Sequence, residues 1–110
     1  MSIFETGLIG EARAALYLRK KGMRVLARRY RAGHGEIDLV ARDGETLVFV
    51  EVKTRIKGRM DEGFRAVNAQ KRERLFSAAQ AYMAAHGAKQ ARFDVIEISA
   101  AGLRHMKNAF

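Results

Sequence analysis

The sequence predicts an α/β fold in which a mixed sheet is flanked by helices. Two long segments, 6–21 and 66–86, carry apolar residues at helical spacing. Between and after them lie short segments rich in Val, Ile and Phe, most of them bounded by glycine. With 110 residues, of which 48% are hydrophobic, the chain has the size and apolar content of one globular domain. We therefore expect residues 1–110 to form a single domain.

The first predicted helix runs from Thr6 to Lys21. Its apolar residues recur at helical spacing, which predicts one face packed against the sheet. That stripe consists of Leu8, Ala12, Ala15, Leu16 and Leu18. Gly22 follows three basic residues and is placed to end the helix.

The next segments predict three strands joined by two turns. The expected strands are Met23–Tyr30, Glu36–Arg42 and Thr46–Thr54, with Gly33-His34-Gly35 as the first turn. Asp43-Gly44, flanked by strand-like segments, is typical of a hairpin. Consecutive strands joined in this way form an antiparallel meander.

The second half of the chain predicts a loop, a helix and a strand. Residues 56–63 are polar and contain glycine, whereas Ala66–His86 has helical periodicity. Arg92–Ser99 predicts a strand buried on both faces, because apolar side chains occupy both its odd and its even positions. Leu103–Met106 is a candidate for a short last strand. The long second helix is then the crossover to the fourth strand, which makes the sheet mixed.

The strongest functional signal is an acid on each hairpin strand together with a lysine. Asp38 lies on the first of these strands. Glu51 and Lys53 lie two residues apart on the second and project from the same face. Buried charge is costly unless it is paired or holds a metal, so a cluster of these three residues predicts a site. Spacing alone also allows a structural ion network of the same residues.

Glu11 belongs with these acids because it lies on the sheet-facing stripe of the first helix. A carboxylate there needs a cationic partner or a shared metal. The alternative is that Glu11 lies at the edge of the stripe and bonds Arg13 or Lys53. Glu36 shares a strand face with Asp38, and we favour a role as the polar start of the strand beside an arginine, Arg31.

Carboxylate oxygens are hard ligands that suit Mg²⁺ or Mn²⁺. We therefore expect Glu11, Asp38 and Glu51 to hold a divalent ion, with the backbone carbonyl of Val52 as a further ligand. Such an ion would relieve the repulsion between the acids and could activate a water for attack on a phosphate. Lys53 would orient or help deprotonate that water, or neutralise the developing charge.

The net charge of +9 favours a polyanionic partner. Basic residues surround the acids in the sequence, which favours nucleic acid over acidic lipid. Charge alone equally allows a merely solubilising surface. The residues expected to contact nucleic acid are Arg31, Arg55, Lys57, Arg59 and Lys71. The three histidines, His34, His86 and His105, are dispersed without ligand spacing, so we expect surface or turn positions for them.

Composition also excludes some classes of protein. There is no cysteine, so disulfides and thiolate metal sites are excluded. The N-terminus has no basic start followed by an apolar stretch, and no apolar run approaches the roughly 18 residues that span a bilayer. We expect a cytoplasmic protein with no membrane association.

The pattern Asp38…Glu51-Val52-Lys53, with Glu11 on a preceding helix, resembles the PD-(D/E)XK nuclease superfamily. The restriction-endonuclease-like core of that superfamily has the element order αβββαβ. Further segments are similar to the YraN-like bacterial family over nearly the whole chain. They are Gly10-Glu11, Arg31, Gly35–Leu39, Val48–Arg55, Ala66-Val67, Lys71, Arg92–Val95 and Asn108–Phe110. That family is regarded as endonuclease-like and akin to archaeal Holliday-junction resolvases.

The resemblance implies a Mg²⁺- or Mn²⁺-dependent DNA endonuclease of resolvase type that acts on branched DNA as a homodimer. By position, the superfamily's catalytic acids and lysine match Glu11, Asp38, Glu51 and Lys53, and Lys71 matches a basic position on the second helix. Around residues 58–66 the family usually has a Phe-Gly turn followed by proline, and this chain has neither. The rival interpretation is a nucleic-acid-binding module that keeps the fold but does not cleave.

Overall fold

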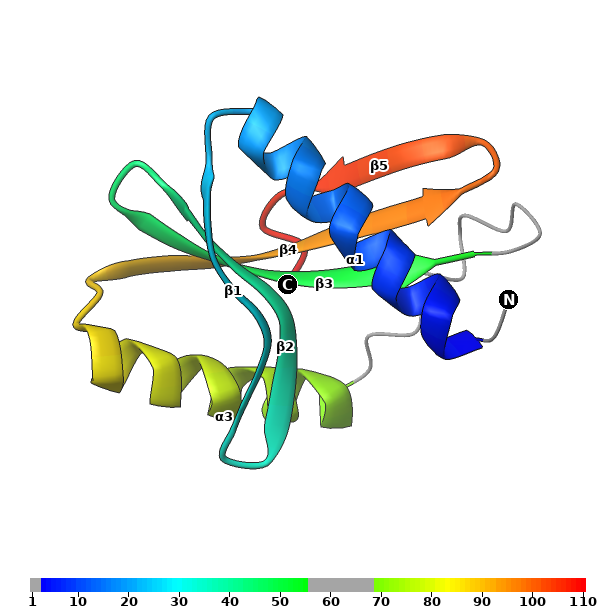
Figure 1. Cartoon of the computed structure of the whole chain (residues 1–110). Helices are drawn as coiled ribbons and strands as arrows, with labels where there is room; N and C mark the ends of the chain where they lie inside the picture. The colour runs from blue at the N-terminus through cyan, green and yellow to red at the C-terminus, as the bar shows by residue number, and fades with distance from the viewer. Residues whose placement is uncertain (1–2, 56–68) are drawn as a thin grey trace.

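A computed structural model describes residues 3–55 and 69–110 as a five-stranded sheet between two helices (Figure 1). The elements in chain order are α1 (Ile3–Lys20), β1 (Arg24–Ala32), β2 (Gly35–Asp43), β3 (Thr46–Thr54), α3 (Ala69–His86), β4 (Gln90–Ser99) and β5 (Gly102–Met106). This order confirms the predicted α/β fold with an αβββαβ core, to which β5 adds an edge strand.

The sheet is mixed, as predicted. β1, β2 and β3 pair antiparallel, β3 and β4 pair parallel, and β4 and β5 pair antiparallel. A parallel pair needs a crossover connection, and α3 lies in that connection. The first strand starts one residue later and ends two residues later than expected, because Arg31 and Ala32 still pair with β2.

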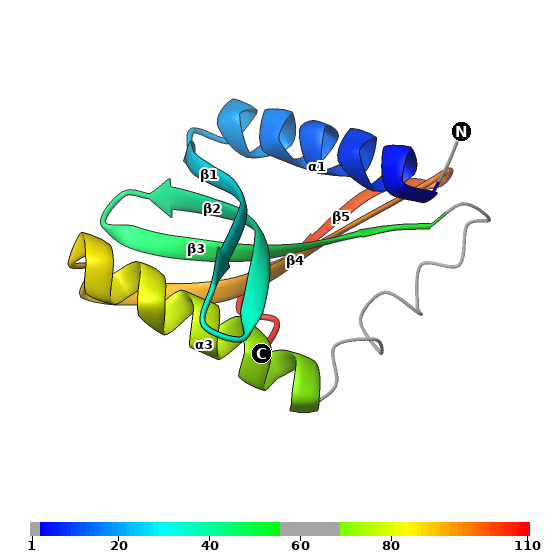
Figure 2. The same ribbon diagram turned by 60° about the horizontal axis from the view of Figure 1, so that its bottom comes forward.

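The two helices cover opposite faces of the sheet, as Figures 1 and 2 show. On the α1 side, Leu18 packs in a core that includes Val50. On the α3 side, Leu75 and Tyr82 pack in a second core that includes Phe49. Successive residues of β3 therefore enter different cores, which explains why the sequence of that strand is almost continuously apolar.

The face of α1 that packs on the sheet differs from the predicted stripe. Ala12 and Leu16 face solvent, and Leu16 is 52% exposed. The helix approaches β3 closely at Gly10, where an added methyl group would collide with the side chain of Thr54. Positions three, four and seven residues after Glu11 form the buried face instead. They are Ala14, Ala15 and Leu18.

The β2–β3 hairpin has the predicted turn but separates at its other end. Gly44 adopts a φ of 62°, which glycine tolerates readily, and the Asp43-Gly44 turn is confirmed. The ladder ends where Leu39 pairs with Val50, so Asp38 and Glu51 lie just beyond the paired region. Separation of the strands leaves space between them for two acidic side chains.

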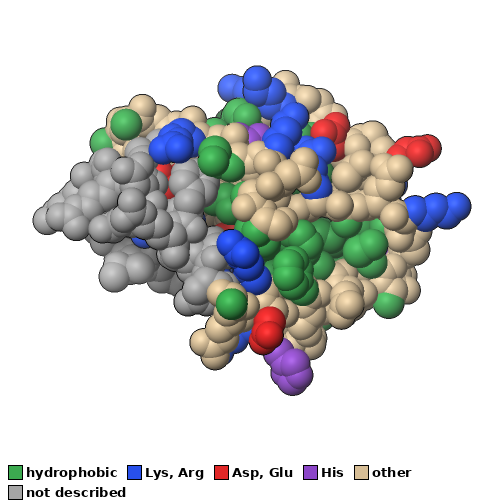
Figure 3. Space-filling view, turned by 180° about the vertical axis from the view of Figure 1, so that it is seen from behind, with side chains coloured by type: hydrophobic (Ala, Val, Ile, Leu, Met, Phe, Trp, Pro, Cys, Tyr) green, Lys and Arg blue, Asp and Glu red, His purple; other side chains and the backbone are tan. Residues whose placement is uncertain are grey.

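Hydrophobic side chains gather on the rear face of the protein, with Lys and Arg side chains beside them (Figure 3). The structure also contains an exposed aromatic cluster. Phe76 is 41% exposed, and its ring centroid lies 4.9 Å from that of Phe93. Phe110 stacks on Phe93 at 5.3 Å. In the part of the chain that is described, neither helix is long and apolar enough to cross a membrane.

Candidate functional site

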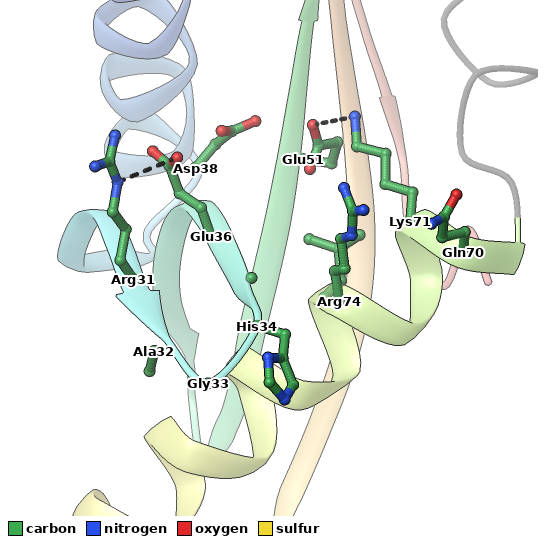
Figure 4. Close-up of a pocket in the computed structure, with 12 residues that line it drawn as sticks. Arg31, Ala32, Gly33, His34, Glu36, Asp38, Glu51, Gln70, Lys71 and Arg74 are labelled. Atoms are coloured by element: carbon green, nitrogen blue, oxygen red, sulfur yellow. Dashed lines mark ion pairs between the residues drawn. The ribbon is translucent and has the colours of Figure 1, made fainter.

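A pocket of about 940 Å³ lies between the β1–β2 turn and the first turns of α3 (Figure 4). The acids Asp38 and Glu51 lie at one end of it. Arg31 points towards that end from the hairpin wall, and Lys71 and Arg74 point towards it from the helix wall. The pocket therefore combines two carboxylates with cationic side chains on both walls.

Asp38 is held in place by the backbone of β3. The N–H of Val52 donates to Oδ2 of Asp38 at 2.8 Å, and the carboxylate serves as an acceptor where the strands no longer pair. Burial raises the pKa of Asp38 to about 8, and the charge of Glu51 contributes to the rise, whereas the bond from Val52 opposes it. The two carboxyl groups also share a hydrogen bond, which requires a proton between them.

Glu51 is 7% exposed and contacts two lysines through one oxygen. The Nζ atoms of Lys71 and Lys53 lie 3.0 and 3.4 Å from Oε1 of Glu51. Burial lowers the pKa of Lys53, and the neighbouring Lys71 lowers it further. Burial also opposes the charge on Lys71, but its hydrogen bond with Lys53 and the charge of Glu51 raise the pKa of Lys71. The pair thus consists of a stable ammonium, Lys71, and an amine that loses its proton more readily, Lys53.

Glu11 lies on the sheet-facing side of α1, as predicted, and is 6% exposed. Its partner is neither Arg13 nor Lys53, because Nε of Arg29 donates to Oε1 of Glu11 at 2.8 Å. This hydrogen bond raises the pKa of Arg29. The charge of Glu11 also contributes to the raised pKa of Asp38, so the helix brings this third acid into electrostatic range of the pocket.

The described residues include no set of three or more acids or histidines that could hold a metal ion in their present orientations. The donor chemistry nevertheless fits Mg²⁺ or Mn²⁺. Asp38 and Glu51 offer hard oxygens, are close enough to share a hydrogen bond, and repel each other when both are ionised. A divalent cation would relieve that repulsion. Metal ligation by Glu11, Asp38, Glu51 and the Val52 carbonyl stays a prediction.

The predicted nucleic-acid contacts fall into three groups. Arg31 and Lys71 line the pocket, and Nε of Arg31 lies 3.3 Å from a carboxylate oxygen of Glu36. This ion pair confirms the favoured position of Glu36 beside Arg31. Arg55 directly follows β3 and is not one of the residues that line the described pocket. Lys57 and Arg59 lie outside the described residues.

The pocket also includes Gln70 and Arg74, and sequence reasoning did not identify Arg74 as a site residue. Residues three and four apart share one face of a helix. Because Arg74 follows Lys71 by three residues, the expected role of Lys71 was the signal that could have identified Arg74.

The prediction that His105 is a surface or turn histidine is wrong. Its side chain is 5% exposed, and Nε2 donates to Oδ2 of Asp94 at 2.7 Å, while the Tyr17 hydroxyl lies 3.0 Å from Nδ1. Asp94 also accepts hydrogen bonds from the side chain of Arg92 and the backbone N–H of Asn108. Burial opposes the charge, but these bonds hold the pKa of Asp94 below its usual range. An aspartate between two apolar residues of the strand, Phe93 and Val95, was the available signal for this network.

The central strands of the αβββαβ core carry two carboxylates and a lysine, and the protein is an α/β protein with a mixed sheet between two helices. The chain belongs to the uncharacterised protein family UPF0102, whose model matches residues 10–98. The YraN-like resemblance is therefore confirmed.

Relatives of this family cover nearly the whole chain. A UPF0102 protein of Rhodopseudomonas palustris (strain BisB18) is 46% identical over 114 residues, covering 100% of this chain and 83% of the relative. A UPF0102 protein of Bradyrhizobium diazoefficiens is 44% identical over 114 residues, covering 100% and 84%. A UPF0102 protein of Chlorobium chlorochromatii is 42% identical over 120 residues, covering 99% and 93%.

Proposed function

We propose that this protein is a divalent-metal-dependent endonuclease that hydrolyses phosphodiester bonds in DNA. The observation that carries the proposal is the convergence of Asp38 and Glu51 at one end of a pocket with cationic walls, where Lys53 contacts Glu51. Pressing two carboxylates together does not stabilise a fold, and burial together with the charge of Glu51 raises the pKa of Asp38 to about 8. Groups perturbed this strongly concentrate at functional sites.

The cations around the acids support a phosphate substrate. Arg31, Lys71 and Arg74 line the pocket, and the whole chain carries a net charge of +9. Such a field attracts a polyanion to a site whose acids would otherwise repel phosphate. The resemblance to PD-(D/E)XK nucleases supports both the choice of site residues and the reaction.

Each residue of the site has a distinct role in this proposal. Asp38 and Glu51 would hold Mg²⁺ or Mn²⁺, with Glu11 and the Val52 carbonyl as further ligands. When bound, the ion supplies a water of lowered pKa and a positive charge beside the phosphate. The N–H of Val52 orients the Asp38 carboxylate. Lys53 lies 3.4 Å from Glu51, where it can orient the attacking water or neutralise developing charge.

Cleavage of a labelled DNA panel tests the proposal. The panel contains a four-way junction, a flap, a single strand and a duplex, each with Mg²⁺, Mn²⁺ or EDTA. We expect metal-dependent cutting that Lys53→Ala reduces by about 10² to 10⁴-fold. Lys89→Ala is the matched control, because Lys89 is exposed and lies outside the pocket lining. Cutting by Lys53→Ala at the wild-type rate would contradict the assigned role.

We extend the proposal to branched DNA as the preferred substrate, to a homodimer as the active form and to the cytoplasm as the compartment. The panel ranks the substrates directly. Sedimentation velocity with and without the four-way junction measures the oligomeric state. A monomer on the junction would refute the dimer and leave the nuclease assignment standing.

A second candidate is a nucleic-acid-binding module that does not cleave. The contacts of Glu51 with both Lys71 and Lys53 favour it, because they already neutralise that carboxylate in the manner of a stable ion network. For such a module, removal of a repelling acid by Asp38→Ala would tighten DNA binding, and no metal would produce cleavage. The nuclease predicts the opposite, since Asp38→Ala would abolish cutting.

A further inference from the structure

Arg74 differs from the other cations of the pocket because no hydrogen bond or ion pair of its side chain is present among the described residues. Arg31 is paired with Glu36, and Lys71 contacts Glu51. Figure 4 shows Arg74 projecting from α3 into the pocket, towards the end where the acids lie. A guanidinium presented to a pocket in this way is available to an anionic ligand.

The backbone that carries Arg74 is firmly fixed. A methyl group on Gly35, the first residue of β2 after the β1–β2 turn, would collide with the main-chain carbonyl of Arg74, so this end of the hairpin and the helix are in direct contact. The N–H of His34 donates to Oγ of Ser77 at 3.3 Å, one helical turn further along. The next residue, Leu75, is 3% exposed in the core. The backbone at Arg74 is therefore held in place by packing, which reduces the entropy lost when its side chain binds a ligand.

The spacing along α3 separates Arg74 from the reacting centre. Lys71 reaches Glu51 at the acid end of the pocket. Arg74 follows it by three residues, which is about 4.5 Å along the helix axis. The two side chains share one helix face. A strand lying in the pocket would meet the acids with one phosphate and Arg74 with another.

We propose that Arg74 binds the phosphate that neighbours the scissile phosphate, so the pocket selects a nucleic-acid strand over an isolated phosphodiester. The inference depends on the proposed function for the position of the scissile phosphate. The planar guanidinium offers two parallel N–H donors that match two phosphate oxygens, and it keeps its charge at any physiological pH. Lysine at this position would preserve the charge but lose the paired donors.

Binding is measured first, without catalysis. Fluorescence anisotropy in EDTA follows a labelled single strand and a four-way junction over a range of salt concentrations. We expect Arg74→Ala to weaken binding about tenfold. We also expect it to reduce, by about one, the slope of the logarithm of affinity against the logarithm of salt concentration. Arg74→Lys restores the slope but only part of the affinity. The matched control is Arg72→Ala on the same helix, because Arg72 lies over the Phe110 ring at 5.4 Å, outside the pocket lining.

Equal losses of affinity in Arg74→Ala and Arg72→Ala would overturn the inference, since only the general positive charge would then matter. These binding data decide the question even if the wild-type protein cleaves nothing, a result that would instead refute the proposed nuclease. If it does cleave, bis(p-nitrophenyl) phosphate, which has no second phosphate, adds a test. Arg74→Ala should raise KM for DNA by a larger factor than KM for that ester. Equal losses on both substrates would place Arg74 at the reacting phosphate and overturn the inference.

Discussion

Replacing Asp38 with asparagine should stabilise the metal-free protein while it abolishes metal-dependent cutting. Burial and the charge of Glu51 raise the pKa of Asp38 from 3.8 to about 8. Between these values the folded state binds a proton that the unfolded state has released, so the free energy of unfolding falls as the pH rises. Asparagine has the same shape, can still accept the bond from Val52, and removes the titrating group.

The size of the effect follows from the pKa difference. pH 7 lies about three units above the unfolded-state pKa of Asp38. The difference in proton binding between the two states therefore changes the free energy of unfolding by about 4 kcal/mol at most. Partial solvent access and the proton shared with Glu51 reduce this, and we expect a gain of about 2 kcal/mol for Asp38→Asn. Near pH 4 most of the gain should be gone, because this pH is close to the unfolded-state pKa of 3.8 and the two states of the wild-type protein then differ little in protonation.

Urea unfolding in EDTA at a series of pH values between about 4 and 8 measures this difference. Glu36→Gln is the matched control, since Glu36 lines the same pocket and its ion pair is with Arg31, whose side chain is largely exposed. That control should change stability by less than about 0.5 kcal/mol. If wild type and Asp38→Asn show the same pH dependence, the assigned perturbation of Asp38 is refuted. Adding Mg²⁺ should stabilise only the wild-type protein.

Three further predictions concern the surroundings of the site. The pKa of Asp94 is held low by its hydrogen bonds, so its stabilising contribution is complete above about pH 4 and is lost as the pH falls through the folded-state value. Asp94→Asn should therefore cost about 3 kcal/mol at pH 7 by urea unfolding and match wild type in strong acid. Gly35→Ala should lower the free energy of unfolding by about 2 kcal/mol and impair cutting, because the added methyl group forces the β1–β2 turn away from α3. Gly44→Ala, the control in the other turn, should lower it by about 1 kcal/mol and leave cutting intact. Glu11→Gln should raise the Mg²⁺ concentration for half-maximal cutting about tenfold if Glu11 is a metal ligand. A loss of stability without that shift would assign Glu11 to its ion pair with Arg29 alone.

Much of the fold was predictable because its signals are local. The Asp43-Gly44 turn, the apolar strands and the helical periodicity all act between residues close in the chain, and the structure confirms them. The stripe on α1 was wrong at Leu16, because periodicity alone does not say which of two overlapping apolar faces meets the sheet. Contacts with β3, including the close approach at Gly10, select the face that contains Glu11.

The candidate site was predictable in its acids and lysine but not in its walls. Asp38, Glu51 and Lys53 lie on adjacent strands of one hairpin, so spacing and strand alternation place them together. Arg74 comes from a helix that follows the hairpin by many residues, and only packing of α3 against the β1–β2 turn brings it into the pocket. The burial of His105 likewise depends on the pairing of β5 with β4, which places it near Asp94.

The sequence by itself determined the order of the elements, the mixed sheet and the group of acids and lysine on the central hairpin. These features follow from residue type and short-range spacing. The tertiary structure alone decided that Glu11 pairs with Arg29, that one oxygen of Glu51 contacts two lysines, and that Arg74 faces the acids. The physical reason is that side-chain partners and pKa values depend on which segments, distant in the chain, exclude water from the same place.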